Sequence, residues 1–312
     1  MVSYLCAYMR YYHTKEFICA YLNCANGDTD IQSGTALAKE RGIHIENPKF
    51  RKSRNEFIPD EKAPIIYKGV VSIKDMGKNN GDELYTLRDN HYDSFIDLLK
   101  DIREKTTVNS KQLDILIKLD FFSEFGDIRK LLKTVEIYNL LAGKKQMSKA
   151  KIIELELPLE LFLAHGKETK SLVKELDIDA IMNELISEAV KDPTLRADDI
   201  DKIKWQIELL GYSNLTIPKA NKRMYVVQSV TSKKTLTVIQ IYEVFSGKTR
   251  EVKAWNRQLH EDLKQGDIID IYKIKKENQK EPTGEVTPDG KRIYRSIPDK
   301  YEYWLISFEI LA

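Results

Sequence analysis

KGVVSIKDMGKNNGDELYTLR, residues 68–88, is the most informative segment of the chain. An apolar beginning, a tight turn at residues 74–77 and a polar helix start are typical of a helix-hairpin-helix motif. Such a turn points successive backbone N–H groups at one phosphate, and the dipole of the following helix adds positive charge. We therefore predict contact with a nucleic-acid backbone, and not with bases. The predicted contact residues are Lys74, Met76, Gly77, Lys78 and Asn79.

The same stretch also fits an ordinary helical corner that is closed by a glycine. A typical hairpin of this kind carries Gly at the second turn position, where this chain has Asp75. A carboxylate there would place negative charge beside the predicted phosphate. Both interpretations are consistent with the residues.

A basic segment, KFRKSR at residues 49–54, lies upstream of the hairpin. Four cations and one aromatic residue in six positions suit a loop that follows a phosphate chain. A solvated basic loop without a ligand is the alternative. The predicted DNA contacts are Lys49, Arg51, Lys52 and Arg54.

Helical patterns surround these two segments. One or two helices are expected over residues 4–21, and another over 31–41, which ends at Gly42 before a short strand at 43–45. Three short helices follow near 79–88, 94–104 and 109–119, and a longer amphipathic helix ends by Gly143. Two of them have capping-box spacing, formed by Ser94 with Asp97 and by Asn109 with Gln112.

The hydrophobic period changes from 3.6 to 2 residues at Met224. Five strand-like runs follow: MYVVQSV, TLTVIQIYEVF, TREVKAW, DIIDIYKIK and YEYWLISFEIL. Five strands in about ninety residues predict a small barrel, so the fold class is multidomain α + β. A basic segment leads into the barrel. At least half of the aromatic residues of the barrel are expected in its core. The predicted single-strand contacts are Lys222, Arg223, Tyr242 and Trp255.

Composition limits the classes of function. The 312 residues suffice for two or three domains, and the net charge of 50 − 48 = +2 does not by itself indicate nucleic-acid binding. Three cysteines do not form a disulfide framework, which favours a reducing compartment. The amino terminus carries charges within its apolar run, so we expect no signal peptide, no membrane contact and a cytoplasmic protein.

Signals for catalysis are weak. The spacing of Cys6, Cys19 and Cys24 includes no C-x-x-C pair, so no metal site is predicted. The sequence contains no phosphate-binding loop, H-E-x-x-H or G-x-S-x-G motif, and no acidic pair suited to two magnesium ions. We predict no catalytic residue. The alternative, a hidden enzyme with a split site, rests only on four scattered histidines: His44, His91, His165 and His260.

Six segments resemble, in the same order, the bacterial DNA polymerase III alpha subunit, the C-family replicative polymerase. They are AYMRYYHTKEFICAYLN (7–23), ALAKERGIHIENPKFRKSRNEF (36–57), KGVVSIKDMG (68–77), YDSFIDLLKDI (92–102), VNSKQLDILIKLDFFSEFG (108–126) and WQIELLGYSN (205–214). The resemblance covers nearly the whole chain, more thinly from 144 to 200. The divergent turn and short connections look more like phage or mobile-element relatives.

The resemblance implies four parts: the end of the polymerase fingers at 1–68, a helix-hairpin-helix domain at 69–143, a helical bridge at 144–221 and an OB-type five-stranded barrel at 222–312. It implies a DNA-binding carboxy-terminal portion of the polymerase that grips primer-template duplex and template single strand. The palm, with its magnesium-binding aspartates, would precede residue 1. We therefore expect no cofactor in this chain and no polymerase activity from it alone.

The resemblance also implies partners. The rest of the polymerase is one, and a sliding clamp is another, because the family carries a clamp-binding peptide between hairpin and barrel. PLELF at residues 158–162 lies in that interval, with Leu159, Leu161 and Phe162 as the candidate contacts. Proline replaces the family's glutamine, and a buried apolar segment is the alternative. A stand-alone DNA-binding or protein-interaction module is the alternative for the whole chain.

Overall fold

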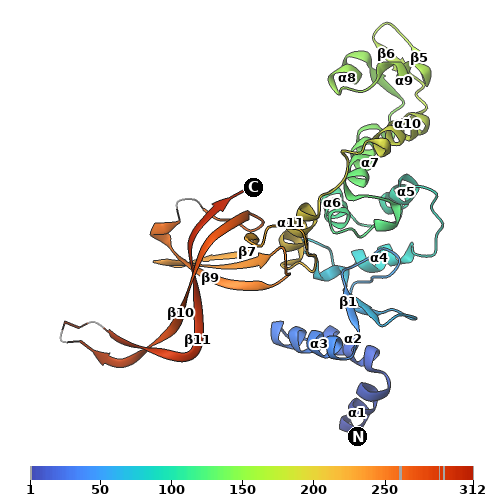
Figure 1. Ribbon diagram of the computed structural model, residues 1–312. Helices are drawn as coiled ribbons and strands as arrows, with labels where there is room; N and C mark the ends of the chain where they lie inside the picture. Colours follow the sequence, from blue (N-terminus) through green and yellow to red (C-terminus); the bar gives the residue numbers. More distant parts are fainter. Residues whose placement is uncertain (1, 260–261, 288, 291, 312) are drawn as a thin grey trace. The chain divides into compact units, whose positions relative to one another are not determined.

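The computed structural model describes residues 2–259, 262–287, 289–290 and 292–311. The chain forms two compact units, residues 1–197 and residues 198–312, and each is described by itself below (Figure 1). The division into fingers, hairpin domain, helical bridge and barrel that the resemblance implies stays a prediction. No helix in the described ranges is both long and apolar enough to span a membrane.

The first unit begins with three helices and a small sheet, and the second and third helices pack against the sheet. The helices are α1 (Val2–Tyr12), α2 (Thr14–Asn23) and α3 (Asp28–Glu40). The strands are β1 (His44–Glu46), β2 (Ile58–Pro59) and β3 (Ile65–Tyr67), in the order β1-β3-β2. Ile18 and Ile66 are fully buried between helix and sheet, so the sheet and α2 share one core.

The middle of this unit holds the hairpin and the helices that support it. They are the 3-10 turn η1 (Val70–Ser72), α4 (Asn80–Thr86), α5 (Phe95–Lys105), α6 (Ser110–Lys118), the 3-10 turn η2 (Ser123–Phe125) and α7 (Ile128–Leu141). Both predicted capping boxes are confirmed, at Ser94 with Asp97 and at Asn109 with Gln112. The apolar start of the hairpin is only a single 3-10 turn, shorter than the half-helix that the sequence suggests.

The unit ends in a helical subassembly with a second small sheet. Its elements are β4 (Gln146–Ser148), α8 (Lys149–Glu154), α9 (Leu159–Ala164), β5 (Lys167–Glu168), β6 (Leu172–Lys174) and α10 (Ile178–Lys191), with strand order β4-β6-β5. Ile137 and Leu141 of α7 pack with Ile181 and Met182 of α10 in one buried cluster. This cluster joins α10 to the helices around the hairpin.

In the residues that the structure describes, the second unit consists of an α-helix, a 3-10 turn and a five-stranded sheet. The elements are α11 (Asp199–Leu210), β7 (Met224–Ser232), β8 (Leu236–Glu243), β9 (Thr249–Trp255), the 3-10 turn η3 (Asn256–Gln258), β10 (Ile268–Val286) and β11 (Arg292–Ile310). The strands pair in the order β10-β11-β9-β8-β7, and β10 also pairs with β7, so the sheet closes on itself. The prediction of five strands is confirmed.

The last two strands are much longer than the sequence indicates. The apolar runs predict strands near 267–275 and 301–311, whereas β10 and β11 each contain 19 residues and pair as far as Val286 and Arg292. Figure 1 shows the outer part of this pair as a two-stranded arm beyond the rest of the sheet. Residues 276–300 are mostly polar, with Pro282 and Gly284 among them, so the arm has no alternating apolar pattern to reveal it.

The segment of residues 54–56 lies in direct contact with the hairpin at two glycines. A Cβ atom on Gly69 would lie 2.0 Å from the backbone oxygen of Asn55, and one on Gly81 would lie 2.7 Å from the backbone carbonyl of Arg54. The Val70 amide donates to the Arg54 carbonyl oxygen at 2.8 Å. Any side chain at either position would separate the two backbones, so the hairpin and the upstream loop fold as one piece.

Replacing Gly69 by Ala should destabilise the first unit by about 1 to 3 kcal/mol, since backbone atoms must move to admit the methyl group. All three tryptophans, at 205, 255 and 304, lie in the second unit. Urea unfolding of Gly69→Ala should therefore shift the helical circular-dichroism transition and leave the tryptophan-fluorescence transition in place. Lys74→Ala, at an exposed position in the same hairpin, is the control; equal transitions for both variants would contradict the close packing.

Candidate nucleic-acid interface

The hairpin turn combines buried apolar residues with exposed lysines. Val70, Ile73 and Leu84 are buried under it, while Lys74 and Lys78 are exposed. Within the described residues neither lysine forms an ion pair. Two exposed cations on one turn, without an internal carboxylate partner, leave their charge available to a phosphate.

Some backbone N–H groups of the turn have a hydrogen-bond acceptor in the described residues, and others do not. The Gly77 N–H donates to Oδ1 of the buried Asn80 at 2.6 Å, so it is not directed at solvent as the sequence interpretation expects. The Lys78 and Asn79 amides have no acceptor in the part of the chain that the structure describes. These two N–H groups stay available to a phosphate oxygen.

The helix dipole contributes less than expected. The helix that follows the turn, α4, has only seven residues, and its first turn carries Asp82 and Glu83. Carboxylates at a helix amino terminus offset its partial positive charge. A phosphate contact at this turn would therefore depend on the lysine side chains and the two amides.

Asp75, the acidic residue of the turn, has a partner. Lys111 Nζ lies 2.8 Å from Asp75 Oδ2, and the Gln112 side chain donates to the Asp75 carbonyl oxygen at 3.3 Å. The Lys111 ammonium lowers the pKa of Asp75. Asp75 also adopts φ 64°, the left-handed conformation that favours Gly and tolerates Asp. Lys111 thus offsets the unfavourable charge, a role that sequence analysis missed because the two residues are far apart in the chain.

In the basic loop, residues 49–54, Arg51 mainly holds the loop against neighbouring elements. Its Nε lies 2.8 Å from Glu124 Oε1, and its guanidinium donates to the backbone oxygens of Arg88 and Asn90. The group also lies 5.0 Å from the centre of the Phe50 ring. These contacts tie the loop to the residues that follow α4 and to η2.

The other loop cations differ in their contacts. Lys52 Nζ lies 3.0 Å from Asp60, and Arg54 Nε lies 2.9 Å from Asp82. The Lys49 amide donates to Ser53, but its ammonium has no carboxylate partner among the described residues. Three of the four predicted cations are therefore engaged inside the chain. Their contact with DNA stays a prediction, and Lys49 is the one with an unpaired charge.

The four predicted single-strand contacts lie in different environments of the second unit. Tyr242 is 2% exposed and its hydroxyl donates to the Leu215 carbonyl oxygen at 2.5 Å, so it belongs to the core and offers no face to a base. The prediction that Tyr242 contacts single-stranded DNA by stacking is therefore corrected. Arg223 pairs with Asp270 at 3.2 Å. Lys222 lies over the Phe245 ring at 5.2 Å.

Trp255 is the accessible aromatic residue of that set. It is 37% exposed and stacks on Trp304 with 4.8 Å between ring centres. Trp304 is paired in register with Lys253, across the parallel β9–β11 contact. One face of Trp255 is therefore covered by Trp304.

The candidate clamp-binding segment forms α9. Phe162 is fully buried in the core of α7, α10 and the second small sheet, and Leu159 and Leu161 pack against the same cluster. The structure thus agrees with the alternative of a buried apolar segment, and clamp binding stays an untested prediction.

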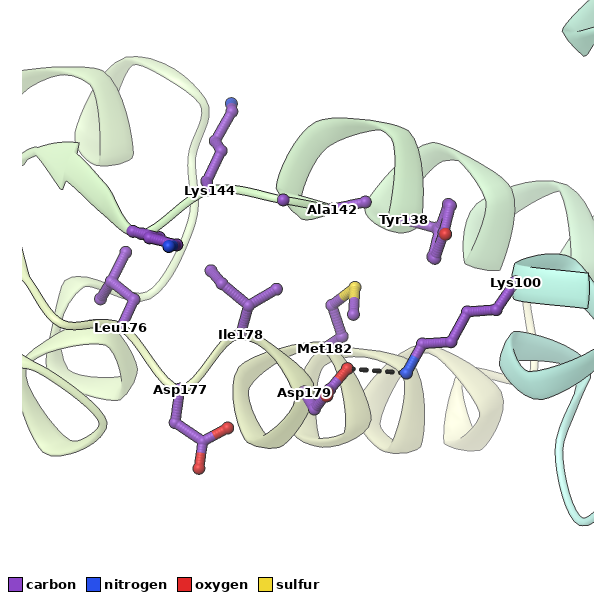
Figure 2. A pocket seen from close by; sticks show the side chains of 11 residues that line it. Lys100, Tyr138, Ala142, Lys144, Leu176, Asp177, Ile178, Asp179 and Met182 are labelled. Carbon is purple, nitrogen blue, oxygen red and sulfur yellow. Dashed lines mark hydrogen bonds and ion pairs between the residues drawn. The ribbon is translucent and has the colours of Figure 1, made fainter. Parts of the chain in front are cut away.

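A cleft of about 370 Å³ lies beside α10 (Figure 2). Figure 2 shows the Lys100 side chain extending from α5 to Asp179, and Lys100 Nζ lies 2.9 Å from Asp179 Oδ1. Lys144 also lines the cleft, and so does Asp177. Because cations and carboxylates both line it, the cleft has no charge preference that would assign a ligand.

The described residues contain no cluster of three metal-binding side chains. His91 contacts Asp93 at 3.0 Å, and His165 contacts Glu184 at 2.8 Å. His260, one of the histidines behind the hidden-enzyme alternative, lies outside the described residues. The histidines within them do not meet in one site.

Comparison with known proteins identifies first the class of motif and then similar proteins. Residues 42–132 match a protein family described as "Helix-hairpin-helix motif", which confirms the hairpin prediction. The chain is 34% identical over 142 residues to DNA polymerase III subunit alpha of Ureaplasma parvum, covering 42% of this chain and 14% of that protein. It is 31% identical over 137 residues to the subunit of Campylobacter jejuni, covering 42% and 11%.

A third similar protein covers more of the chain. It is DNA polymerase III subunit alpha of Chlamydia pneumoniae, 24% identical over 255 residues, which cover 75% of this chain and 19% of that protein. The resemblance to the alpha subunit is therefore confirmed over these parts. The chain spans between about a tenth and a fifth of the length of these relatives.

The loop around Asp60 should give the first unit a measurable dependence on pH. Hydrogen bonds from the Lys62 and Ala63 amides, followed by Lys52, lower the pKa of Asp60 to about 2. Because this pKa lies below the unfolded value, ionised Asp60 stabilises the fold above about pH 4, and the contribution is lost as pH falls toward 2. Asp60→Asn should therefore destabilise the unit near neutral pH.

The stability difference between wild type and Asp60→Asn should narrow as the pH approaches about 3, in urea unfolding followed by circular dichroism. Glu61→Gln, at the exposed neighbouring carboxylate, should leave stability unchanged. If the stability difference between wild type and Asp60→Asn stays constant with pH, the lowered pKa of Asp60 is contradicted.

Proposed function

We propose that this chain is a DNA-binding part of a replicative DNA polymerase alpha subunit, and that its hairpin grips primer-template duplex through the phosphate backbone. The observation that carries the proposal is the exposed turn at residues 74–79. It presents Lys74 and Lys78 without carboxylate partners among the described residues, and the match to helix-hairpin-helix proteins covers it. Such contacts position the protein on DNA without reading its sequence.

Three features of the turn support this proposal. Lys111 offsets the charge of Asp75, so Lys74 and Lys78 give residues 74–79 a net positive charge. The unused amides of Lys78 and Asn79 can donate to the same phosphate. The buried Asn80 fixes Gly77 at the turn, so these groups are held in place before DNA arrives.

For the second unit we propose an OB-type barrel that lies near the template single strand. The support is its topology: five strands, consecutive antiparallel pairing from β7 to β9, a parallel β9–β11 contact and closure between β10 and β7. OB folds are five-stranded Greek-key barrels that bind oligonucleotides. The basic segment with Lys222 and Arg223 leads into it.

Further parts of the proposal come from the resemblance. Residues 1–68 would be the end of the fingers, and the chain would work with the remainder of the polymerase in the cytoplasm. No cofactor and no catalytic residue are proposed for these 312 residues, since palm aspartates elsewhere in the polymerase would hold magnesium. A phage-like origin and a sliding-clamp partner are the remaining proposals.

The double variant Lys74→Ala, Lys78→Ala should weaken binding to blunt duplex DNA. With about four phosphate contacts, the logarithm of wild-type affinity should fall with the logarithm of salt at a slope of about −3.6, and removing two contacts should reduce the slope by about 1.8. Fluorescence anisotropy of labelled duplex, titrated at several salt concentrations, measures both quantities.

The matched control is Lys39→Ala, Lys170→Ala, which removes the same charge from two exposed lysines of the first unit without ion pairs among the described residues. Its salt slope should equal that of wild type. Equal slopes for all three proteins would overturn the hairpin contact, and absence of duplex binding at low salt would favour a protein-interaction module instead.

A further inference from the structure

Residues 192–197, the last of the first unit, form a strap that leads from α10 to the second unit. The strap has hydrogen bonds of its own. Asp192 Oδ1 accepts from the Thr194 amide at 2.8 Å and from the Thr194 hydroxyl at 2.7 Å, and the Leu195 amide donates to the Asp192 carbonyl oxygen at 3.3 Å. These bonds give the strap a defined turn, unlike a flexible linker rich in Gly and Ser.

The amino-terminal turn of α7 holds the strap at both ends. Ala197, the last residue of the first unit, is buried, and its amide donates to Asp127 Oδ1 at 3.1 Å. The same oxygen accepts from the Arg129 amide at 3.0 Å, so Asp127 is also the N-cap of α7. Lys130 Nζ donates to the Val190 carbonyl oxygen, just before the strap. Asp127 therefore fixes the point at which the chain leaves the first unit.

The second unit begins at the next residue. Asp198 is the N-cap position of α11, and its carbonyl oxygen accepts from the Lys202 amide at 3.2 Å. Ile203 and Ile207 of α11 are fully buried in one cluster with residues of β7 and β8. The chain thus passes from a buried, hydrogen-bonded residue of one unit directly into a packed helix of the other.

We propose that Asp127 is a latch that keeps the covalent connection between the two units as short as one peptide bond, and that its release adds the strap to this connection. A released strap of about six residues could span up to about 20 Å. A longer tether lowers the effective concentration of one binding site near another. The latch therefore sets how strongly a ligand that contacts both units is held, and not how either unit binds alone.

A helix cap alone does not require the contact between Asp127 and the strap. Asp177 caps α10, which has 14 residues as α7 has, and among the described residues its side chain bonds only the Ala180 amide. Asp127 additionally holds Ala197, 70 positions away. Glycine is well tolerated at an N-cap, so Asp127→Gly removes the acceptor of the Ala197 amide while α7 keeps its start. Asp177→Gly is the matched control, because it changes a cap without touching the strap.

The test measures the distribution of distances between spin labels on the two units of the full chain, by double electron–electron resonance. Asp127→Gly should broaden the distribution by about 10 Å, since a flexible tether of six residues has a root-mean-square length of roughly 13 Å. A Gly-Gly-Ser insertion after Ala197 adds slack without touching the latch, and it should broaden the distribution as well. The labels require His91→Cys and Lys248→Cys at exposed positions, with Cys6→Ser and Cys24→Ser.

Two variants should keep the wild-type distribution: Asp127→Asn, which retains both an Oδ1 acceptor and a cap, and Asp177→Gly. Hydrogen–deuterium exchange in a peptide covering residues 190–199 should be faster in Asp127→Gly alone. A wild-type width in Asp127→Gly would overturn the latch, whether or not the insertion broadens the distribution. Equal broadening in Asp127→Gly and Asp177→Gly would overturn it too, because loss of a cap would then explain the effect.

The consequence for DNA rests on the proposed function, because it requires the hairpin to bind duplex and the barrel to bind template single strand. Asp127→Gly should weaken binding to primed template by about threefold or more and leave blunt-duplex affinity unchanged, in fluorescence anisotropy. Equal loss of blunt-duplex affinity would overturn this consequence. A wild type that binds primed template no better than blunt duplex would contradict the proposed function of the barrel, while the spin-label distances still decide the latch.

Discussion

The close contact between the backbone of residues 54–56 and the two glycines of the hairpin, Gly69 and Gly81, is the constraint on which the first unit depends. Side chains complete it: the Asn55 amide donates to Asp82 at 2.6 Å, and Asn55 Oδ1 accepts from the Gly81 amide at 2.8 Å. This contact fixes the turn at 74–79 relative to the basic loop, because both are parts of one hydrogen-bonded piece. A phosphate-binding turn needs such rigidity, since its lysines and amides must be held in position before DNA binds.

Local distribution of charge, and not net charge, decides what each surface can do. The net charge is only +2, and some cations have carboxylate partners close by, as Arg51 has Glu124 and Arg54 has Asp82. Exposed pairs of this kind contribute little to stability, but they reduce the local positive potential. Cations without a carboxylate partner among the described residues are therefore the informative ones, and Lys74 and Lys78 are two of them on the hairpin.

Much of the fold follows from local sequence signals. Both capping boxes, the short helices and the change to five strands at Met224 depend on residues close in sequence, so they could be predicted. The pairing of Lys111 with Asp75 could not, because it joins residues 36 apart. The burial of Tyr242 depends on α11 packing over the sheet, and the β10–β11 arm carries no alternating pattern. In the candidate site, sequence therefore indicated the lysines of the turn, while their supporting contacts required the structure.

Hydrogen–deuterium exchange of the full chain, with and without blunt duplex, measures whether the hairpin turn contacts the phosphate backbone of duplex DNA. The Lys78 and Asn79 amides have no acceptor among the described residues, so they should exchange rapidly in the free protein. If the turn binds a phosphate, duplex DNA should slow exchange in a peptide covering residues 74–80. Unchanged exchange in this peptide, with protection confined to other parts of the chain, would contradict it.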